Sequence, residues 1–497
     1  MASVYRTEDC EFTVDREALI QRLGEALQKD SLLVEDEAMR PYECDGLSGY
    51  RQMPQVVCIP ETIEQVRHVL QVCSEMGVPV VARGAGTSLS AGALPHPQGV
   101  LLSLAKFNQI LDIDADRRMA RLQPGVRNLA ISEAAAPYGL YYAPDPSSQI
   151  ACSIGGNVAE NAGGVHCLKY GLTVHNILEV TMVTMDGELV TLGSEALDSA
   201  GYDLMAAVTG SEGMLGVLVE IKVKLLPQPP MKDVLLASVN DVEPAGTAVA
   251  GIIAAGILPG GLEMMDGPAI QAAEDFVHAG YPTDVAAILI CELDGNADDV
   301  QAQRERVCAL LEEAGAAEIR VAKDDDERAR FWAGRKAAFP AVGRISPDYY
   351  CIDGTIPRKH LAHVLNRMQA LSDEYGQRVV NVFHAGDGNL HPLVLYDGNV
   401  PGEFERTEEL GGRILELCVE VGGTVTGEHG VGMEKINQMC VQFNTPALNQ
   451  FRALKHAFDP QGLLNPGKAI PTLNRCAEFG AMHVHHGELP HPDIPRY

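Results

Sequence analysis

The chain has 497 residues, which is enough for two or three domains with substantial cores. Its net charge of −29 at pH 7 argues against nucleic acid and against an anionic membrane surface as partners. The longest nearly apolar run, Ala248 to Leu258, is too short to span a bilayer, and the first residues lack the apolar core of a signal peptide. Cysteines scattered without a Cys-x-x-Cys pair are typical of reduced thiols. We therefore expect a cytoplasmic protein.

The first half of the chain predicts helices and strands around a glycine-rich loop. Apolar residues at helical spacing predict a helix over 61–76, which begins after Pro60 and ends before Gly77. The short apolar run over 78–82 is predicted to be a strand that leads into the loop. The same criteria predict a strand over 100–104, a hairpin over 110–122, a helix over 128–138, a hairpin that turns at Asp186-Gly187, and a strand over 217–225.

The loop Arg83-Gly84-Ala85-Gly86-Thr87-Ser88, which continues to Gly92, leaves backbone N–H groups uncovered and can wrap phosphate oxygens. It is not a Walker A loop, because it has no lysine, and Leu89 stands where a dinucleotide fingerprint needs glycine. On its own, it could equally be a turn without a ligand. A second segment rich in glycine and asparagine, 153–164, follows, and loops of small polar residues are often functional.

The second half alternates apolar strands with longer helical patterns after a break at Leu226–Pro230. We interpret it as an α+β domain and expect it to be built of two βαβ-type halves. Its predicted strands are 233–239, 286–292, 349–353, 378–384 and 390–396, and its predicted helices lie near 297–314, 325–338, 358–375 and 403–420. We therefore predict domains over 1–228 and 229–430, and a segment over 431–497 that returns to the first domain and ends in a tail.

The sequence from His384 to His391 predicts a hairpin with a two-residue turn at Asp387-Gly388, which places the two histidines opposite each other. Such a pair suits a divalent metal, although two histidines at a wet hairpin end would look the same. Glu428 and His429 offer a third ligand, and neighbours in an extended segment point to opposite sides. We expect a His₂Glu metal site, with His429 left as an acid–base group. These residue types fit a metal hydrolase as well as an oxidoreductase.

Several motifs, taken together and in order, resemble the flavin domain of the vanillyl-alcohol-oxidase class: Pro60–Val66, Arg83–Gly92, Pro144–Ser148, Ser153–Gly164 and Gly210–Gly216. The segments His384–His391 and Gly427–Gly430 resemble its branch of FAD-linked D-2-hydroxy-acid dehydrogenases, which includes the catalytic subunits of bacterial glycolate oxidases. This resemblance runs essentially from end to end. It implies an α+β, two-domain flavoprotein with an FAD-binding domain of the vanillyl-alcohol-oxidase (PCMH) type and a ferredoxin-like substrate domain.

The resemblance implies FAD, with the glycine loop on its pyrophosphate and the 144–164 region along the rest of the cofactor. Thr87 stands about where some members of the class carry a histidine bonded to the flavin, so we expect non-covalent FAD. The implied FAD-binding residues are Arg83, Gly84, Ala85, Gly86, Thr87, Ser88, Gly92, Pro144, Asp145, Ser148, Gly155, Gly156, Asn157, Asn161, Gly163, Gly164, Glu212, Gly213, Val217 and Asn465.

By the same resemblance, His384, His391 and Glu428 hold a divalent metal, with Zn²⁺ as first choice and Mn²⁺ or Fe²⁺ as alternatives. The metal lowers the pKa of the substrate hydroxyl, His429 takes its proton, and the Cα hydride passes to FAD. Arg335 resembles the arginine that binds the substrate carboxylate.

Two positions depart from the relatives that oxidise larger diacids. Phe339 and Cys351 align with a threonine and a lysine there, which favours a small substrate such as glycolate or D-lactate. The implied partners are a second flavin-domain subunit and an iron–sulfur subunit, through which the protein could associate peripherally with a membrane. The tail with His483, His485 and His486 is interpreted as a docking segment. The alternatives are a stand-alone D-lactate dehydrogenase and a non-catalytic subunit that binds metal or flavin.

Overall fold

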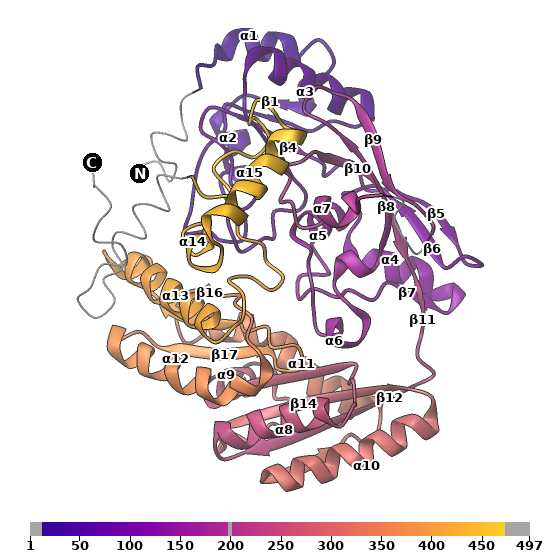
Figure 1. Ribbon diagram of the computed structural model, residues 1–497, viewed down its shortest axis with the longest axis vertical. Coiled ribbons are helices and arrows are strands. Elements are labelled where there is room, and N and C mark those ends of the chain that lie inside the picture. The colour runs from indigo at the N-terminus through magenta and orange to yellow at the C-terminus, as the bar shows by residue number, and fades with distance from the viewer. Residues whose placement is uncertain (1–11, 197–200, 473–497) are drawn as a thin grey trace.

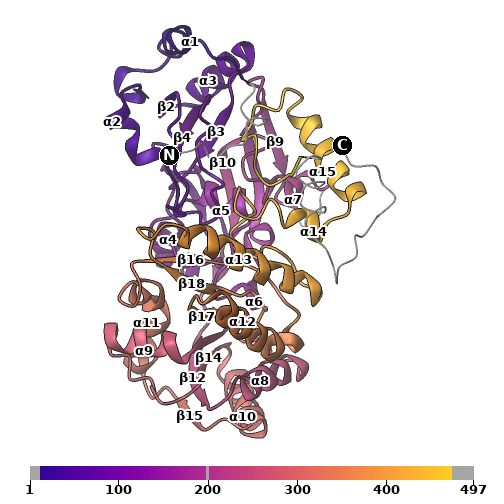
Figure 2. The ribbon, with the colours of Figure 1, turned by 90° about the vertical axis from the view of Figure 1, so that its left-hand side faces the viewer.

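The computed structural model describes residues 12–196 and 201–472, so the histidine-containing tail lies outside the described residues. The N-terminal half forms one body, and residues 231–420 form a second body beneath it (Figure 1). The last helices, α14 (Met439–Gln442) and α15 (Thr445–Phe458), lie with the first body in both views (Figures 1 and 2). No described helix is long and apolar enough to cross a bilayer.

The first body contains a small sheet in the order β1 (Leu32–Leu33), β2 (Val56–Cys58), β4 (Val100–Ser103) and β3 (Val80–Arg83), whose last three strands are parallel. Helix α3 (Ile63–Met76) begins at the Thr62 cap and ends at Gly77, whose φ of +65° favours glycine. Its apolar face packs against these strands. The predicted helix over 61–76 is therefore confirmed, and so is the strand that leads into the glycine loop.

A second, antiparallel sheet has the order β5 (Ile110–Asp114), β6 (Met119–Leu122), β10 (Val217–Lys224), β8 (Ile177–Val183) and β9 (Leu189–Gly193). The predicted hairpins and strand are confirmed here. The glycine- and asparagine-rich segment holds α5 (Ile154–Glu160), whose seven residues are too few to show helical periodicity in the sequence. The other helices of this body are α1 (Arg16–Leu23), α2 (Asp36–Met39), α4 (Asn128–Ala135), α6 (Cys167–Tyr170) and α7 (Leu204–Val208).

The second body is a seven-stranded sheet with helices on both faces. Successive residues of its strands alternate between the two sides: Leu235 and Ala237 join the core under α8, α10, α12 and α13, whereas Val234 and Leu236 join the core under α9 and α11. The strand order is β15 (Glu318–Val321), β12 (Met231–Val239), β14 (Ala287–Gly295), β13 (Gly261–Asp266), β17 (Val379–His384), β18 (Pro392–Tyr396) and β16 (Asp348–Cys351). The helices are α8 (Val242–Ala254), α9 (Gly267–Val277), α10 (Ala297–Ala314), α11 (Asp325–Val342), α12 (Leu361–Tyr375) and α13 (Glu403–Glu420).

This sheet consists of two similar halves. Helix α8 connects β12 to β13 with β14 between them, and α12 connects β16 to β17 with β18 between them. Both are split βαβ units, as the two-halves interpretation predicted. Antiparallel pairing of β13 with β17 joins the halves. The sequence reading omitted α8, β13 and α9, which follow one another over 242–277.

The end of the described chain reaches the strand that precedes the glycine loop. Leu463 accepts a hydrogen bond from the Val80 N–H, and the Asn465 N–H donates to the carbonyl of Val80, each at 2.8 Å. The Asn465 side chain also donates to the carbonyls of Gly92 and Glu212. These contacts tie the C-terminal segment to the first body, and the exact domain boundaries stay a prediction.

Candidate active site

Two histidines of the β17–β18 hairpin lie on one face, although in a different register from the one predicted. His384 pairs with Asn389 and not with His391, because the loop between the strands has four residues, 385–388. Gly386 and Leu390, expected within the hairpin ladder, instead donate to the carbonyls of Leu262 and Gly354. A shift of two residues keeps every side chain on its face, so the imidazoles still meet, with ring centroids 5.1 Å apart.

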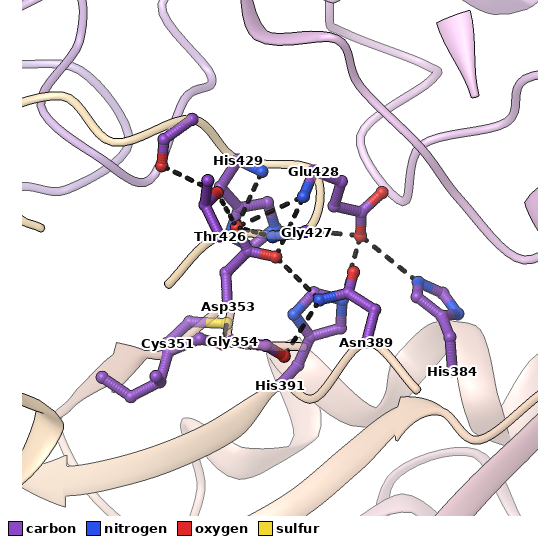
Figure 3. A network of polar contacts seen from close by, with 12 residues as sticks. Cys351, Asp353, Gly354, His384, Asn389, His391, Thr426, Gly427, Glu428 and His429 are labelled. Atoms are coloured by element: carbon purple, nitrogen blue, oxygen red, sulfur yellow. Dashed lines mark hydrogen bonds and ion pairs between the residues drawn. The ribbon is translucent and has the colours of Figure 1, made fainter. Parts of the chain in front are cut away.

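Glu428 reaches both histidines. Its Oε1 lies 3.3 Å from Nε2 of His384 and 2.9 Å from Nε2 of His391, and all three residues are buried (Figure 3). Burial alone would raise the pKa of Glu428, but hydrogen bonds from the two imidazoles hold it well below its ordinary value. We call His384, His391 and Glu428 the histidine–glutamate cluster.

A buried carboxylate that the sequence reading missed lies behind this cluster. Glu263, in the middle of β13, accepts from Nδ1 of His384 at 2.8 Å and from Nε of Arg335 at 2.8 Å. It is fully buried. Because Nδ1 of His384 bonds Glu263, a metal ion could replace the proton on Nε2, at the side of the ring that faces Glu428. A glutamate within the apolar run Gly261–Asp266 was the signal that could have revealed it.

A second buried carboxylate fixes the loop that carries Glu428. Asp353 accepts from the backbone N–H groups of Gly427, Glu428 and His429, at 3.1, 3.2 and 2.9 Å (Figure 3). It also accepts from Asn389 and from the buried Lys435. Burial alone would raise the pKa of Asp353, but Lys435 holds it well below its ordinary value. One carboxylate therefore joins the loop to the hairpin.

These hydrogen bonds bend the loop, so the prediction that Glu428 and His429 point to opposite sides of an extended segment is wrong. The His429 ring stacks on that of His391 with centroids 4.9 Å apart, and its Nε2 lies 3.9 Å from Oε1 of Glu428. Its Nδ1 is buried and has no hydrogen-bond partner in the part of the chain that the structure describes. Burial lowers the pKa of His429 to about 4, which keeps this imidazole neutral near pH 7.

The glycine loop and the second glycine-rich segment line one cavity of about 730 Å³. We call the lining parts of these segments, residues 82–93 and 145–162, the glycine cradle. At Gly84 and Gly86 an added Cβ would lie 2.2 Å from Ser153 Oγ and from the Arg83 guanidinium respectively, so those side chains would have to move. The cavity therefore depends on exposed backbone, as a close approach to an elongated ligand requires.

The same cavity extends from the glycine cradle to the second body. Arg335, Lys336 and Phe339 of α11 line it, and so do His391, Glu428 and His429. The two bodies also come close at Gly163, where a Cβ would lie 2.6 Å from Oε2 of Glu428. The structure thus places the two sequence signals in one continuous space.

Most of the residues predicted to bind FAD line this cavity. Those that do are Arg83, Gly84, Ala85, Gly86, Thr87, Ser88, Gly92, Asp145, Ser148, Gly155, Gly156, Asn157, Glu212 and Gly213. Pro144, Asn161, Gly163, Gly164, Val217 and Asn465 lie outside the lining. Two of these have evident structural roles: Asn161 ends α5 with a φ of +55°, and a Cβ on Gly164 would lie 2.4 Å from the Asp145 carbonyl oxygen.

Charged contacts hold the two bodies together beside the cavity. Nδ1 of His166 lies 2.7 Å from Asp145, and its Nε2 lies 3.1 Å from Glu292 of β14. Lys169 pairs with Asp294 of the same strand. Burial alone would lower the pKa of His166, but the two carboxylates raise it to about 10. A protonated His166 therefore bridges the two bodies.

Comparisons with known proteins agree with this architecture. Residues 54–193 match the family described as FAD binding domain, and residues 228–469 match FAD linked oxidases, C-terminal domain. The chain is 66% identical to the glycolate oxidase subunit GlcD of Escherichia coli K12, over 97% of each chain. The chain belongs to the FAD-linked oxidase family.

This FAD-linked oxidase is also 31% identical to a D-lactate dehydrogenase of Anaerostipes hadrus, over 90% of the chain and 96% of that protein. Its fold is similar to that of p-cresol methylhydroxylase, with a TM-score of 0.80 at 16% identity, over 93% of the chain and 98% of the other. The predicted fold class, the resemblance to FAD-linked 2-hydroxy-acid dehydrogenases and the need for FAD are thereby confirmed.

Proposed function

We propose that this protein oxidises a small 2-hydroxy acid, glycolate in the first place, to the 2-oxo acid, as the catalytic subunit of a glycolate oxidase complex. The observation that carries the proposal is the cavity that connects the glycine cradle to Arg335, to His391 and Glu428 of the histidine–glutamate cluster, and to His429. The identity to a glycolate oxidase subunit supports the substrate. FAD supplies the acceptor for the hydride that leaves the substrate Cα.

A divalent metal fits the histidine–glutamate cluster. The donor atoms lie within 4.8 Å of one another, and two imidazoles with one carboxylate form a set that catalytic Zn²⁺ sites use. Burial alone would lower the pKa of His384, yet Glu263 and Glu428 hold it well above its ordinary value, so the surroundings favour positive charge at this point. We propose Zn²⁺, with Mn²⁺ or Fe²⁺ as alternatives; the metal would supply a Lewis acid for the substrate hydroxyl.

The remaining roles fall to side chains of the chain itself. His429 lines the cavity, and its Nδ1 has no hydrogen-bond partner among the described residues, so this imidazole is placed to take the hydroxyl proton as the hydride leaves. Arg335 lines the cavity with its Nε bonded to Glu263, and a guanidinium has further N–H groups for a substrate carboxylate. Glu263 thus orients two groups that would contact the substrate or its metal.

The size of the substrate follows from the wall of the cavity. Phe339 lines it as an apolar ring that packs edge-on against Tyr349, with centroids 6.1 Å apart. Cys351 is buried beside His391 and His429 and offers no cation for a second carboxylate. We therefore favour glycolate or D-lactate over a long dicarboxylate.

Three finer points belong to the same proposal. Thr87 lines the cavity at the position expected for a tethering histidine, so FAD is held without a covalent bond. The proposed partners are a second flavin-domain subunit and an iron–sulfur subunit, which would take the electrons onward. The protein would then act in the cytoplasm, at the membrane only through these partners.

The test is anaerobic bleaching of the flavin absorbance in purified protein by glycolate, each lactate enantiomer and 2-hydroxyglutarate. We expect glycolate to bleach the flavin and 2-hydroxyglutarate to leave it oxidised. Bleaching by D-lactate alone would favour a D-lactate dehydrogenase. If none of these acids reduces the bound flavin, the proposed activity is wrong.

A further inference from the structure

A second group of possible metal ligands shares His391 with the histidine–glutamate cluster. Sγ of Cys351, a ring nitrogen of His391 and a ring nitrogen of His429 lie within 4.8 Å of one another. Cys351 ends β16 and is 4% exposed, and His391 is 2% exposed. The thiol donates to the carbonyl of Ile352 in a long contact, at 3.6 Å.

Each of the two imidazoles of this group has a buried nitrogen that no described residue bonds. Nε2 of His391 faces Glu428 at 2.9 Å, whereas its Nδ1 is buried and finds no hydrogen-bond partner within residues 12–196 and 201–472. The same holds for Nδ1 of His429 within these residues. A buried polar atom without a hydrogen-bond partner lowers the stability of the folded protein, so its presence suggests that it binds something else. Both imidazoles also present a ring nitrogen within 4.8 Å of the buried thiol, which is the spacing of metal donors.

We propose that Cys351, His391 and His429 form a binding position for a soft divalent ion such as Zn²⁺ or Cd²⁺, which inhibits the enzyme when it is filled. Sulfur and imidazole nitrogen are the ligands these ions prefer. The thiol releases its proton to solvent as the metal–sulfur bond forms, and His391, when its other ring nitrogen already binds the resident metal, releases its remaining N–H proton to solvent as well, so that an imidazolate bridges the two ions. Inhibition rests on the proposed function, because the ion would occupy the imidazole that takes the substrate proton.

This position differs from the histidine–glutamate cluster in chemistry. The cluster offers a carboxylate oxygen and no sulfur, so it also suits Mn²⁺, whereas a thiolate position discriminates against that harder ion. Cd²⁺ should therefore inhibit through Cys351 under conditions in which added Mn²⁺ does not. Comparing the two ions therefore distinguishes inhibition at this position from inhibition by replacement of the metal in the histidine–glutamate cluster.

The experiment titrates the metal-replete, flavin-loaded enzyme with Cd²⁺ or Mn²⁺ and compares wild type with Cys351→Ser. Cys308→Ser is the matched control, because Cys308 is a partly exposed free thiol on α10, in the same body. After gel filtration, bound cadmium, resident metal and flavin are measured, together with flavin reduction by glycolate. We expect Cys351→Ser to bind one Cd²⁺ fewer than wild type. The Cd²⁺ concentration that inhibits it by half should be higher by about tenfold or more, and a tenfold change corresponds to about 1.4 kcal/mol of binding free energy. Cys308→Ser should be inhibited like wild type.

Equal cadmium uptake and equal inhibition in wild type and Cys351→Ser would overturn the inference and leave the proposed function intact. Cadmium uptake that depends on Cys351 but leaves flavin reduction unchanged would overturn the inhibitory role and count against His429 as the base. If Cys351→Ser does not retain flavin, X-ray absorption at the cadmium edge in Cys308→Ser decides the matter. A cadmium–sulfur bond there supports the site, and coordination by oxygen and nitrogen alone overturns it.

Discussion

The glycine cradle and the histidine–glutamate cluster lie on one cavity but are built in opposite ways. The cradle relies on backbone: an added Cβ at Gly84 or Gly86 would push against Ser153 or Arg83, and Gly86 has a φ of +72° that favours glycine. The cluster relies on buried side chains that two further carboxylates hold, Glu263 from β13 and Asp353 after β16. A ligand at the cradle should therefore depend on small residues, and a metal at the cluster on charged residues that do not touch it.

The largest effect is expected when the cluster loses a ligand. His391→Ala should abolish glycolate oxidation and remove the metal, while FAD stays bound because the cradle belongs to the first body. Metal analysis, flavin absorbance and turnover measure the three quantities. His363→Ala, which removes an exposed histidine from α12, is the control and should behave like wild type. Full activity without bound divalent metal in wild type would refute the metal site.

A smaller loss is expected behind the cluster. Glu263→Gln removes the charge that orients His384 and Arg335, so metal affinity or activity should fall by about 10–100-fold, as for other outer partners of metal ligands. Competition with a chelator measures the affinity. Glu318→Gln on β15 changes an exposed carboxylate of the same sheet and should have no effect. Unchanged metal affinity and unchanged KM in Glu263→Gln would show that the charge of Glu263 does not orient His384 or Arg335.

In the cradle, Gly86→Val should weaken FAD retention by about tenfold or more, while the metal stays bound. Valine is strained at the φ of +72°, and its Cβ would lie 2.2 Å from the Arg83 guanidinium. The flavin that remains after gel filtration measures the effect. Gly251→Ala, in the middle of α8 with its nearest neighbour at 3.7 Å, controls for a general glycine effect. Equal FAD retention in Gly86→Val would contradict the role of the loop.

The smallest effect concerns the contact between the two bodies. The folded pKa of His166 is about 10 and its ordinary value is 6.5, so its stabilising effect is complete below about pH 6.5 and disappears as the pH rises toward 10. His166→Gln should lower the melting temperature by roughly 2 °C or more at pH 6, and the difference should shrink by pH 9. His456→Gln, at an exposed position on α15, is the control. A difference that does not change with pH would show that His166 is neutral.

The sequence predicted the ligand types better than their arrangement. The prediction that His384 and His391 share a face is correct although the predicted register is wrong, because a shift of two residues leaves each side chain on the same side of the strand. The prediction that Glu428 and His429 point to opposite sides is wrong, because Asp353, which is distant in the sequence, bends their loop by accepting hydrogen bonds from its backbone. Glu263 and Asp353 themselves were missed, since their roles arise only when β13, β16 and the hairpin come together.

In the fold, long periodic helices such as α3 and α10 were predictable from their apolar spacing. The stretch over 242–277 was not, because α8 and α9 are rich in alanine and glycine and present few large apolar residues to mark a face. Helix α5 was missed because it spans less than two full turns beyond its cap. The small residues of α8 and α9 let these helices pack closely against their neighbours, and such packing cannot be recognised from the sequence pattern.

The most direct test of the account compares Glu428→Gln with His429→Asn, measured by metal content and by stopped-flow reduction of the flavin with glycolate. Glu428→Gln should lose metal and substrate binding together. His429→Asn should keep both metal and FAD, yet reduce its flavin about 10²–10⁴-fold more slowly, the usual contribution of a general base. Loss of metal from His429→Asn would make His429 a ligand, and reduction at the wild-type rate would mean that another group takes the proton. Either result would contradict the division of roles at the centre of the proposed mechanism.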